Sequence, residues 1–311
     1  MANIHLESIS PGIALILMLG LSLVLSSCGF QNYLRNYTQL DRPRYVAENR
    51  HLPPPEASPT SLKIVSYNIK YALRISEAIA LLRRHSELRD ADVLLLQEMD
   101  AAGVRQIAAA LGYNYVYYPA VVHPLHKKDF GNAVLSRWPI IDDEKIILPN
   151  LNLRSRQRIA VAATLQVGKK RVKVFSVHMG IFVKPSERQK RMKSILQTLT
   201  PDIDAYVIGG DFNTFTKKDR QYILDSFKGS SFQWVTRDLG WTNRSPYLLF
   251  RKSPLDHIYV KNFRVIQTGK VVDYSASDHI PIWTKVAFQP ANADRDPGPY
   301  AVTTLAGRKD F

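Results

Sequence analysis

Tyr206-Val207-Ile208-Gly209-Gly210-Asp211-Phe212-Asn213 has the pattern of a buried strand that ends in two glycines and two polar side chains. Glycine adopts backbone conformations closed to other residues, so we expect a tight turn at Gly209 and Gly210. Side chains two residues apart lie on the same side of an extended chain, which would direct Asp211 and Asn213 at one ligand. Asp211 could hold or deprotonate a water, and Asn213 could donate to a phosphate oxygen. A Gly-Asp-x-Asn segment is about as often a simple Asx turn, so other motifs must decide.

Other apolar runs also end, or begin, at polar residues. Leu94-Leu95-Leu96-Gln97-Glu98 ends in a carboxylate, which suits a divalent cation that takes oxygen ligands. Val65-Ser66-Tyr67-Asn68 ends in an amide, and Phe175-Ser176-Val177-His178 ends in an imidazole. Asp256 stands at the head of another run, and Ser277-Asp278-His279 comes directly before the last one. Each residue alone has an ordinary structural explanation, such as a helix-capping Glu or a structural His.

Short apolar runs of strand length recur through the middle of the chain, and few helical patterns separate them. The predicted strands are 62–67, 93–96, 133–136, 160–167, 172–177, 205–208, 257–260 and 281–286. The predicted helices are 77–88, capped by Ser76, then 104–111, and 185–199, opened by Pro185. This pattern favours an α+β fold, with two packed and mostly antiparallel β-sheets flanked by helices, over a doubly wound sheet.

The size and charge of the chain limit the classes of function. With 311 residues, 45% of them hydrophobic, the chain can form one large folded domain. Lys and Arg exceed Asp and Glu by 42 to 27, and the net charge of +15 favours anionic partners such as nucleic acid or phospholipid headgroups. General solubility is the alternative explanation of this charge.

Four basic clusters could bind either of these partners. They lie at 127–128, 169–173, 188–193 and 217–220. Such clusters can follow a phosphate backbone, or hold a protein on an acidic membrane. The tyrosines between 113 and 118 could stack on bases, but their alternation at strand spacing favours core packing.

The N-terminal region predicts export. The apolar run from Gly12 to Leu25 suits a signal peptide and is short for a bilayer span. It leads to Cys28, the only cysteine, in Leu25-Ser26-Ser27-Cys28, which resembles the bacterial lipobox. We therefore expect an exported lipoprotein anchored to a membrane through Cys28, in the outer membrane if the host is Gram-negative. The segment before the run has Glu7 and no Lys or Arg, which is unusual for a signal, and a free thiol at Cys28 is the alternative.

Four segments are predicted along the chain. Residues 1–28 form the signal and lipoprotein segment, and 29–60 a proline-rich linker. Residues 61–289 form the catalytic domain, and 290–311 a loose C-terminal tail without apolar periodicity.

The polar motifs occur in the order Asn, Gln-Glu, Ser-x-His, Gly-Asp-x-Asn, Leu-Asp-x-Ile and Ser-Asp-His, between Asn68 and His279. This series resembles the endonuclease/exonuclease/phosphatase superfamily, and it spans nearly the whole predicted domain. The resemblance implies a four-layered α/β sandwich and an attack of water on a phosphate ester. It also implies dependence on Mg²⁺, for which Mn²⁺ is a possible substitute.

The resemblance further implies a role for each motif residue. Glu98 is the expected principal Mg²⁺ ligand, and His279 the expected general base, with Asp256 orienting its ring. Asp211 would position the attacking water, while Asn213 and His178 bind the phosphate. The full set comprises the catalytic residues His279, Asp256, Asp211 and His178, the phosphate-binding residues Asn213, Asn132 and Arg158, and the metal ligands Glu98, Asn68 and Asp278. Arg156 is the alternative to Arg158, and Asn132 could equally belong to a simple turn with Gly131.

The substrate remains open among several classes. Apurinic endonucleases of this superfamily usually follow the Glu with Thr-Lys, whereas Met99-Asp100 follows Glu98 here. Lys70 also stands where that branch places an acidic residue. We expect an exported, monomeric nuclease, with nucleic acid favoured over phospholipid. A sphingomyelinase-like lipid phosphodiesterase is the alternative, and a non-catalytic polyanion-binding scaffold comes third.

Overall fold

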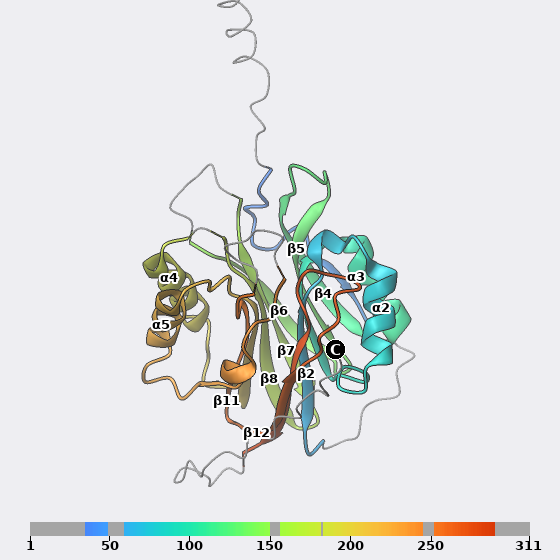
Figure 1. Ribbon diagram of the computed structural model, residues 1–311. Coiled ribbons are helices and arrows are strands. Elements are labelled where there is room, and N and C mark those ends of the chain that lie inside the picture. The colour runs from blue at the N-terminus through green and yellow to red at the C-terminus, as the bar shows by residue number, and fades with distance from the viewer. Residues whose placement is uncertain (1–34, 49–58, 150–155, 182, 245–251, 290–311) are drawn as a thin grey trace, which may run out of the picture. The chain divides into compact units, whose positions relative to one another are not determined.

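The computed structural model describes residues 35–48, 59–149, 156–181, 183–244 and 252–289. The described residues belong to one compact unit that begins at Arg35. In it two β-sheets pack face to face, and helices cover their outer faces, as Figure 1 shows. The α+β sandwich predicted from the sequence is confirmed. The predicted signal segment with Cys28, and the tail 290–311, lie outside the described residues.

The first sheet has seven strands. They are β1 (Tyr45–Ala47), β2 (Leu62–Asn68), β3 (Val93–Met99), β4 (Asn114–Val122), β5 (Asp129–Ser136), β12 (Phe263–Lys270) and β13 (Ile282–Phe288). Their order across the sheet is β1-β4-β5-β3-β2-β13-β12, and only the central pair β2 and β3 is parallel. The alternating tyrosines lie on β4, except Tyr113, which directly precedes it. Tyr113, Tyr117 and Tyr118 are buried, so the prediction of core packing is confirmed for these three.

The second sheet has six strands. They are β6 (Ile140–Ile147), β7 (Ile159–Val167), β8 (Lys170–His178), β9 (Ala205–Asp211), β10 (Gln233–Trp234) and β11 (Asp256–Lys261). Their order is β10-β11-β9-β8-β7-β6, with β8 and β9 parallel. The sequence did not predict β6 or β12, because these edge strands are half exposed and carry charged residues instead of an apolar run.

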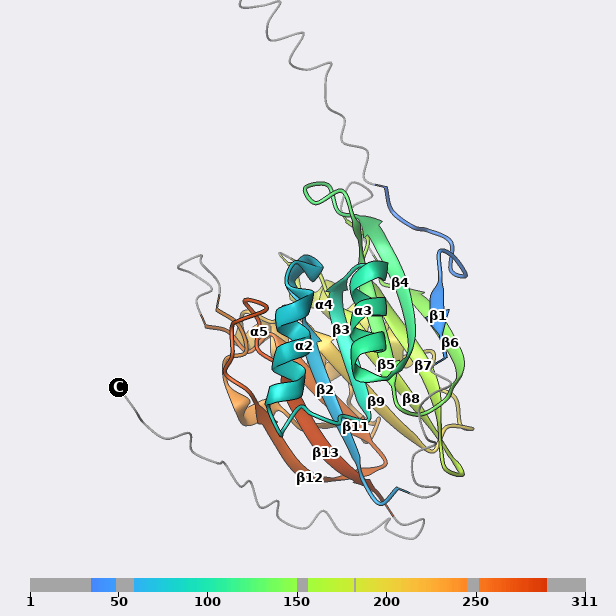
Figure 2. The same ribbon diagram turned by 90° about the vertical axis from the view of Figure 1, so that its right-hand side faces the viewer.

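Four α-helices and two short 3₁₀ helices complete the described fold. The helices are α2 (Ile75–Arg84), α3 (Ala101–Leu111), α4 (Pro185–Leu196), α5 (Lys217–Ser226), η1 (Lys70–Ala72) and η2 (Arg237–Leu239). In Figure 2, α2 and α3 lie over the first sheet; α4 and α5 contribute to the core on the outer face of the second. A third core fills the space between the sheets. None of the helices described is long and apolar enough to cross a membrane.

Three details of the predicted helices differ from the structure. Ser76 does not cap the first helix, since α2 already begins at Ile75 and Arg74 precedes it without a side-chain cap. That helix stops at Arg84 rather than at residue 88, because His85 adopts an extended conformation. The basic helix that begins at Pro185 ends at Leu196, three residues earlier than expected.

The two glycines of the opening motif do not form a turn, because β9 continues through both to Asp211. A Cβ atom at Gly210 would lie 1.9 Å from the carbonyl oxygen of Val177 on β8, and φ at Gly210 is +151°. A Cβ at Gly209 would lie 2.7 Å from Leu95 of the opposite sheet. The glycines therefore permit close packing of strands and sheets, not a change of chain direction.

The predicted linker is wrong for residues 35–48, which are part of the folded unit. β1 pairs with β4 and extends the first sheet. Lys145 of the second sheet, 3% exposed, donates to the carbonyl oxygens of Tyr37 and Arg42. Gln157 also donates to the Tyr37 carbonyl. The segment thus supplies acceptors to buried polar groups of the domain, which the polar sequence alone did not reveal.

Candidate active site

Three strands of the second sheet place polar side chains in one row across the sheet. His178 ends β8, Asp211 ends β9 and Asp256 begins β11. In the strand register His178 is opposite Asp211, and Asp211 is opposite Asp256. All three residues are 1–2% exposed. The register of the sheet therefore brings together groups that lie up to 78 positions apart in the sequence.

The first sheet contributes Asn68 and Glu98 from the parallel strands β2 and β3. The register of β3 against β5 shifts between Leu96 and Met99, and Glu98 has φ of +59°. Such a bulge re-aims a side chain, and a non-glycine residue with positive φ is costly unless the surroundings hold it. The Glu98 carboxylate accepts from the Asn68 amide at 3.2 Å and from the backbone N–H of Tyr71 at 3.2 Å. Asn68 also donates to Asp211 at 3.1 Å, which connects the two sheets.

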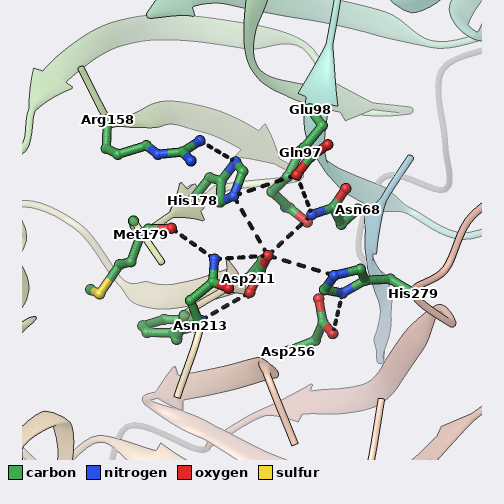
Figure 3. A network of polar contacts seen from close by, with 12 residues as sticks. Asn68, Gln97, Glu98, Arg158, His178, Met179, Asp211, Asn213, Asp256 and His279 are labelled. Carbon is green, nitrogen blue, oxygen red and sulfur yellow. Dashed lines mark hydrogen bonds and ion pairs between the residues drawn. The ribbon is translucent and has the colours of Figure 1, made fainter. Parts of the chain in front are cut away.

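His279 contacts the Asp256 carboxylate through one nitrogen of its ring. Its Nδ1 is 2.8 Å from Asp256 Oδ2, and its Nε2 is 3.8 Å from Asp211 Oδ2. Figure 3 shows His279 between the two carboxylates. Thr242 donates to the same Asp256 oxygen at 2.6 Å. The contact with Asp256 fixes the Nδ1–H tautomer and directs the other ring nitrogen toward Asp211.

His178 lies on the opposite side of Asp211 from His279 and contacts Arg158. The Arg158 guanidinium is 3.3 Å from His178 Nδ1, and His178 Nε2 is 3.5 Å from Asp211 Oδ2. With Nδ1 accepting from Arg158, Nε2 carries the proton and points at the carboxylates. The arginine also lies over the ring of Phe130, 5.1 Å from its centroid. Arg156, the alternative, is exposed and contacts His123 instead.

The ionisable groups of this cluster have strongly shifted pKa values. Burial lowers the pKa of His178 well below its usual range, and the charges of Arg158 and His279 lower it further. Burial raises the pKa of Asp211 to about 7, against the opposing effect of His279. Burial also lowers the His279 pKa, but Asp256 and Asp211 outweigh this and raise it to about 10. Burial raises the pKa of Glu98, opposed mainly by Arg158. Burial therefore disfavours the charged forms of Asp211, Glu98 and His178, whereas the neighbouring carboxylates stabilise the charged form of His279.

The residues present fit a divalent cation. Glu98, Asp211 and Asp256 supply hard oxygen ligands from both sheets, of the kind that Mg²⁺ and Mn²⁺ take. Ligand atoms of Asp211, Asp256 and His279 lie within 4.8 Å of one another. One oxygen of Asp256, Oδ1, is buried and has no hydrogen-bond partner among the described residues. A buried carboxylate oxygen without a donor is costly, and a cation would satisfy it.

Two predicted site residues have amide groups engaged elsewhere. Asn132 donates to the carbonyl oxygens of Ile159 and Ser176, and so ties β5 to both β7 and β8. Asn213 donates to Met179 O at 2.8 Å and to Asp211 Oδ2 at 3.1 Å. To bind phosphate through its amide nitrogen, Asn213 would have to exchange one of these contacts.

Asp278 forms an ion pair with Lys70, and its charge contributes to the raised pKa of Glu98. The carboxylate lies 2.9 Å from Lys70 Nζ and is about a third exposed. Thr242 and Lys70 are site neighbours that sequence reasoning missed. Thr242 follows no recognisable motif, and only the approach of the loop before β11 brings it to Asp256. In the sequence Lys70 is informative only as a departure from the apurinic endonuclease pattern.

Comparison with known families identifies a matching family model. The model of the Endonuclease/Exonuclease/phosphatase family matches residues 65–279, more than half of the chain. No curated protein matches the sequence.

Solved structures with the same fold support this match. A protein of this family from Leptotrichia buccalis C-1013-b superposes with a TM-score of 0.62 at 19% identity, covering 73% of this chain and 100% of that one. TDP2 of D. rerio, complexed with single strand DNA product, has a TM-score of 0.58 at 16% identity, covering 73% and 99%. The Bacteroides thetaiotaomicron VPI-5482 mannosyl-6-phosphatase has a TM-score of 0.57 at 19% identity, covering 73% and 100%. At these identities the likeness shows the fold.

Proposed function

Because the chain belongs to the endonuclease/exonuclease/phosphatase family of metal-dependent phosphoester hydrolases, we propose that it is a nuclease that cleaves phosphodiester bonds. The observation that carries the proposal is the pair of His279 and Asp256, with the free ring nitrogen of His279 directed at Asp211. Glu98 and Asn68 face this pair from the other sheet.

The chain's own residues supply the steps of hydrolysis. Asp211 positions a water, and His279 Nε2 takes a proton from it as the water oxygen bonds to phosphorus. The bond from phosphorus to the leaving oxygen breaks, and that oxygen takes a proton from solvent. Asp256 stabilises the imidazolium, while Arg158 and His178 would donate to the phosphate as its negative charge develops.

A divalent cation held by Glu98 and the neighbouring carboxylates would neutralise charge on the phosphate and oppose the carboxylate charge that raises the His279 pKa. With that charge offset, the His279 pKa would fall from about 10 towards neutral pH, where a general base is most effective.

Nucleic acid is favoured as substrate by charge. The net charge of +15 suits a polyanion. TDP2, whose fold the chain shares, was solved with a single strand DNA product. Some residues of the predicted basic clusters form ion pairs within the domain and are not free to bind nucleic acid. Arg188 is buried against Asp219, and Lys173 is paired with Glu144.

The test is hydrolysis by the purified protein with Mg²⁺, Mn²⁺ or EDTA. The substrates are plasmid DNA, an RNA oligonucleotide, sphingomyelin vesicles and bis(4-nitrophenyl) phosphate. We expect cleavage of nucleic acid that needs the cation, and a loss of about 10²- to 10⁴-fold in His279→Ala. His85→Ala is the matched control, because His85 contacts Asp273 outside this cluster.

Each other outcome has a definite meaning. Cation-dependent cleavage of sphingomyelin alone would make the protein a lipid phosphodiesterase. Binding of DNA without hydrolysis of any substrate would make it a polyanion-binding scaffold. Near-normal turnover by a folded His279→Ala variant would reject His279 as the base.

We also propose that the protein is exported and anchored to a membrane by a lipid on Cys28. The support is the sequence Leu25-Ser26-Ser27-Cys28 after an apolar run. Labelling of cells with a radioactive fatty acid should label the wild-type protein and leave Cys28→Ala unlabelled. Equal labelling of both would refute the anchor.

A further inference from the structure

A pocket of about 390 Å³ lies next to the candidate active site. Its walls include Ser277 and Asp278, which directly precede His279, and Lys70, whose backbone N–H donates to Asn68. The backbone N–H of Arg244 donates to the Asp278 carbonyl at 2.7 Å. The pocket volume is in the range of small-ligand sites, roughly 300–1,000 Å³. The pocket therefore shares its wall with the loop that carries the base.

The pocket carries an excess of positive charge. Lys70, Arg74 and Arg244 line it, against the single carboxylate of Asp278. That carboxylate is already paired with Lys70. Arg74 donates to a backbone carbonyl, and Arg244 lies over the ring of Tyr274, 5.8 Å from its centroid. In the described part of the chain neither arginine has a carboxylate partner, so the pocket favours an anion.

Tyr274, which lines this pocket, has a hydroxyl group without an acceptor in the described part of the chain. The hydroxyl oxygen is buried. The ring is held in place by stacking on Trp241, at 10° between the ring planes. Burial raises the Tyr274 pKa, so the hydroxyl keeps its proton. An acceptor oxygen from a ligand would remove the cost of leaving this group unpaired.

We propose that this pocket binds the phosphate next to the scissile phosphate in a nucleic acid strand, an inference that rests on the proposed nuclease function. Arg74 and Arg244 supply the positive charge, and Tyr274 donates to a phosphate oxygen. A repeating phosphodiester has a second anion one nucleotide away from the bond that is cut. A phosphocholine headgroup has a cation there, which the two arginines would repel.

The test compares substrates that have one cleavable bond each. They are the thymidine dinucleotide TpT, its 5′-phosphorylated form pTpT and its 3′-phosphorylated form TpTp. We expect the wild-type protein to cleave one phosphorylated form with a kcat/KM about tenfold or more above that for TpT, because a charge-assisted contact is gained. Arg74→Gln and Arg244→Gln should reduce the ratio of these two kcat/KM values towards 1. Tyr274→Phe should reduce the ratio in part.

Arg264→Gln is the matched control, since Arg264 is exposed on β12 and does not line the pocket. It removes the same charge and should keep the preference. The pocket assignment is overturned if the wild-type protein shows no preference, or if both pocket variants keep it. A wild-type protein that hydrolyses bis(4-nitrophenyl) phosphate but cuts neither dinucleotides nor longer strands would instead reject the nuclease function, and the pocket assignment with it.

Discussion

Asp256 shows how much of the site depends on one side chain. A single oxygen, Oδ2, accepts from both His279 and Thr242, while Oδ1 has no hydrogen-bond partner among the described residues. The carboxylate thereby fixes the His279 ring and leaves one oxygen for a cation. The sequence indicated the pairing of Asp256 with His279 only through the family resemblance, because the two residues are 23 positions apart.

Asp256→Asn should lower kcat by about 10²- to 10⁴-fold, the range of general-base catalysis. The amide nitrogen can donate to Nδ1 and so place the ring proton on Nε2, where the base must be free. Rates with bis(4-nitrophenyl) phosphate and Mg²⁺ measure the effect, and Asp238→Asn, an exposed residue on η2, is the control. Unchanged kcat in Asp256→Asn would show that this carboxylate does not orient the base.

At the scale of the elements, close approach between strands positions the site. Gly210 lets β9 pair in parallel with β8, so that Asp211 lies beside His178. The bulge in β3 turns Glu98 towards the second sheet. Buried Gln97 donates to Ser176 across the sheets, and Ser176 donates to the Leu96 carbonyl. These contacts join the two sheets beside the polar cluster.

Gly210→Ala should destabilise the protein by about 2–4 kcal/mol, since the new methyl meets a backbone carbonyl and φ is positive. Gly229→Ala is the control, because Gly229 also has a positive φ but nothing lies within 4 Å of a Cβ there. It should cost about 1 kcal/mol. Urea unfolding measures both variants, and equal losses would show that the contact with Val177 is unimportant.

For the molecule as a whole, the segment 35–48 belongs to the domain. β1 covers the edge of β4, and the Arg44 guanidinium pairs with Asp143 at 2.6 Å. Lys145 and Gln157 depend on the backbone carbonyls of this segment for hydrogen bonds. Removing the segment would take both carbonyl acceptors from buried Lys145 and leave the Gln157 amide with the Ala120 carbonyl.

A chain that begins at residue 61 should therefore be less stable than one that begins at residue 35, by about 2–5 kcal/mol. Buried donors that lose their acceptors bear the full cost of desolvation. The midpoints of urea unfolding of the two chains give the comparison. Coincident midpoints would show that the segment 35–48 adds nothing to the stability of the domain.

Buried neutral histidines make the whole molecule sensitive to acid. Burial lowers the pKa of His257 to about 3 and that of His123 to about 4. As the pH falls below about 6.5, these histidines become protonated in the unfolded chain but stay neutral in the folded one. The stability these groups contribute is therefore present above about pH 6.5 and is lost as the pH falls from there towards 4.

Between pH 6 and 4.5, each such histidine adds up to about 1.4 kcal/mol per pH unit to the slope of the free energy of unfolding. His257→Gln should make that slope shallower by about one histidine's share, whatever its effect on stability at pH 7. Urea unfolding at several pH values measures the slope. An unchanged slope in His257→Gln would mean that this ring is protonated in the folded state.

The sequence by itself determined the fold class, the family and most of the residues that the structure brings together at the candidate site. Strands that are apolar on both faces must be covered on both sides, which indicates packed layers. The polar residues at the strand ends form short motifs that can be recognised in the sequence. Strand register, the bulge at Glu98 and the contacts of the segment 35–48 were decided only by the tertiary structure. These features depend on which strands become neighbours, and so does the basic pocket beside His279. These contacts join residues that are far apart in the sequence, so a pattern within one short stretch cannot predict them.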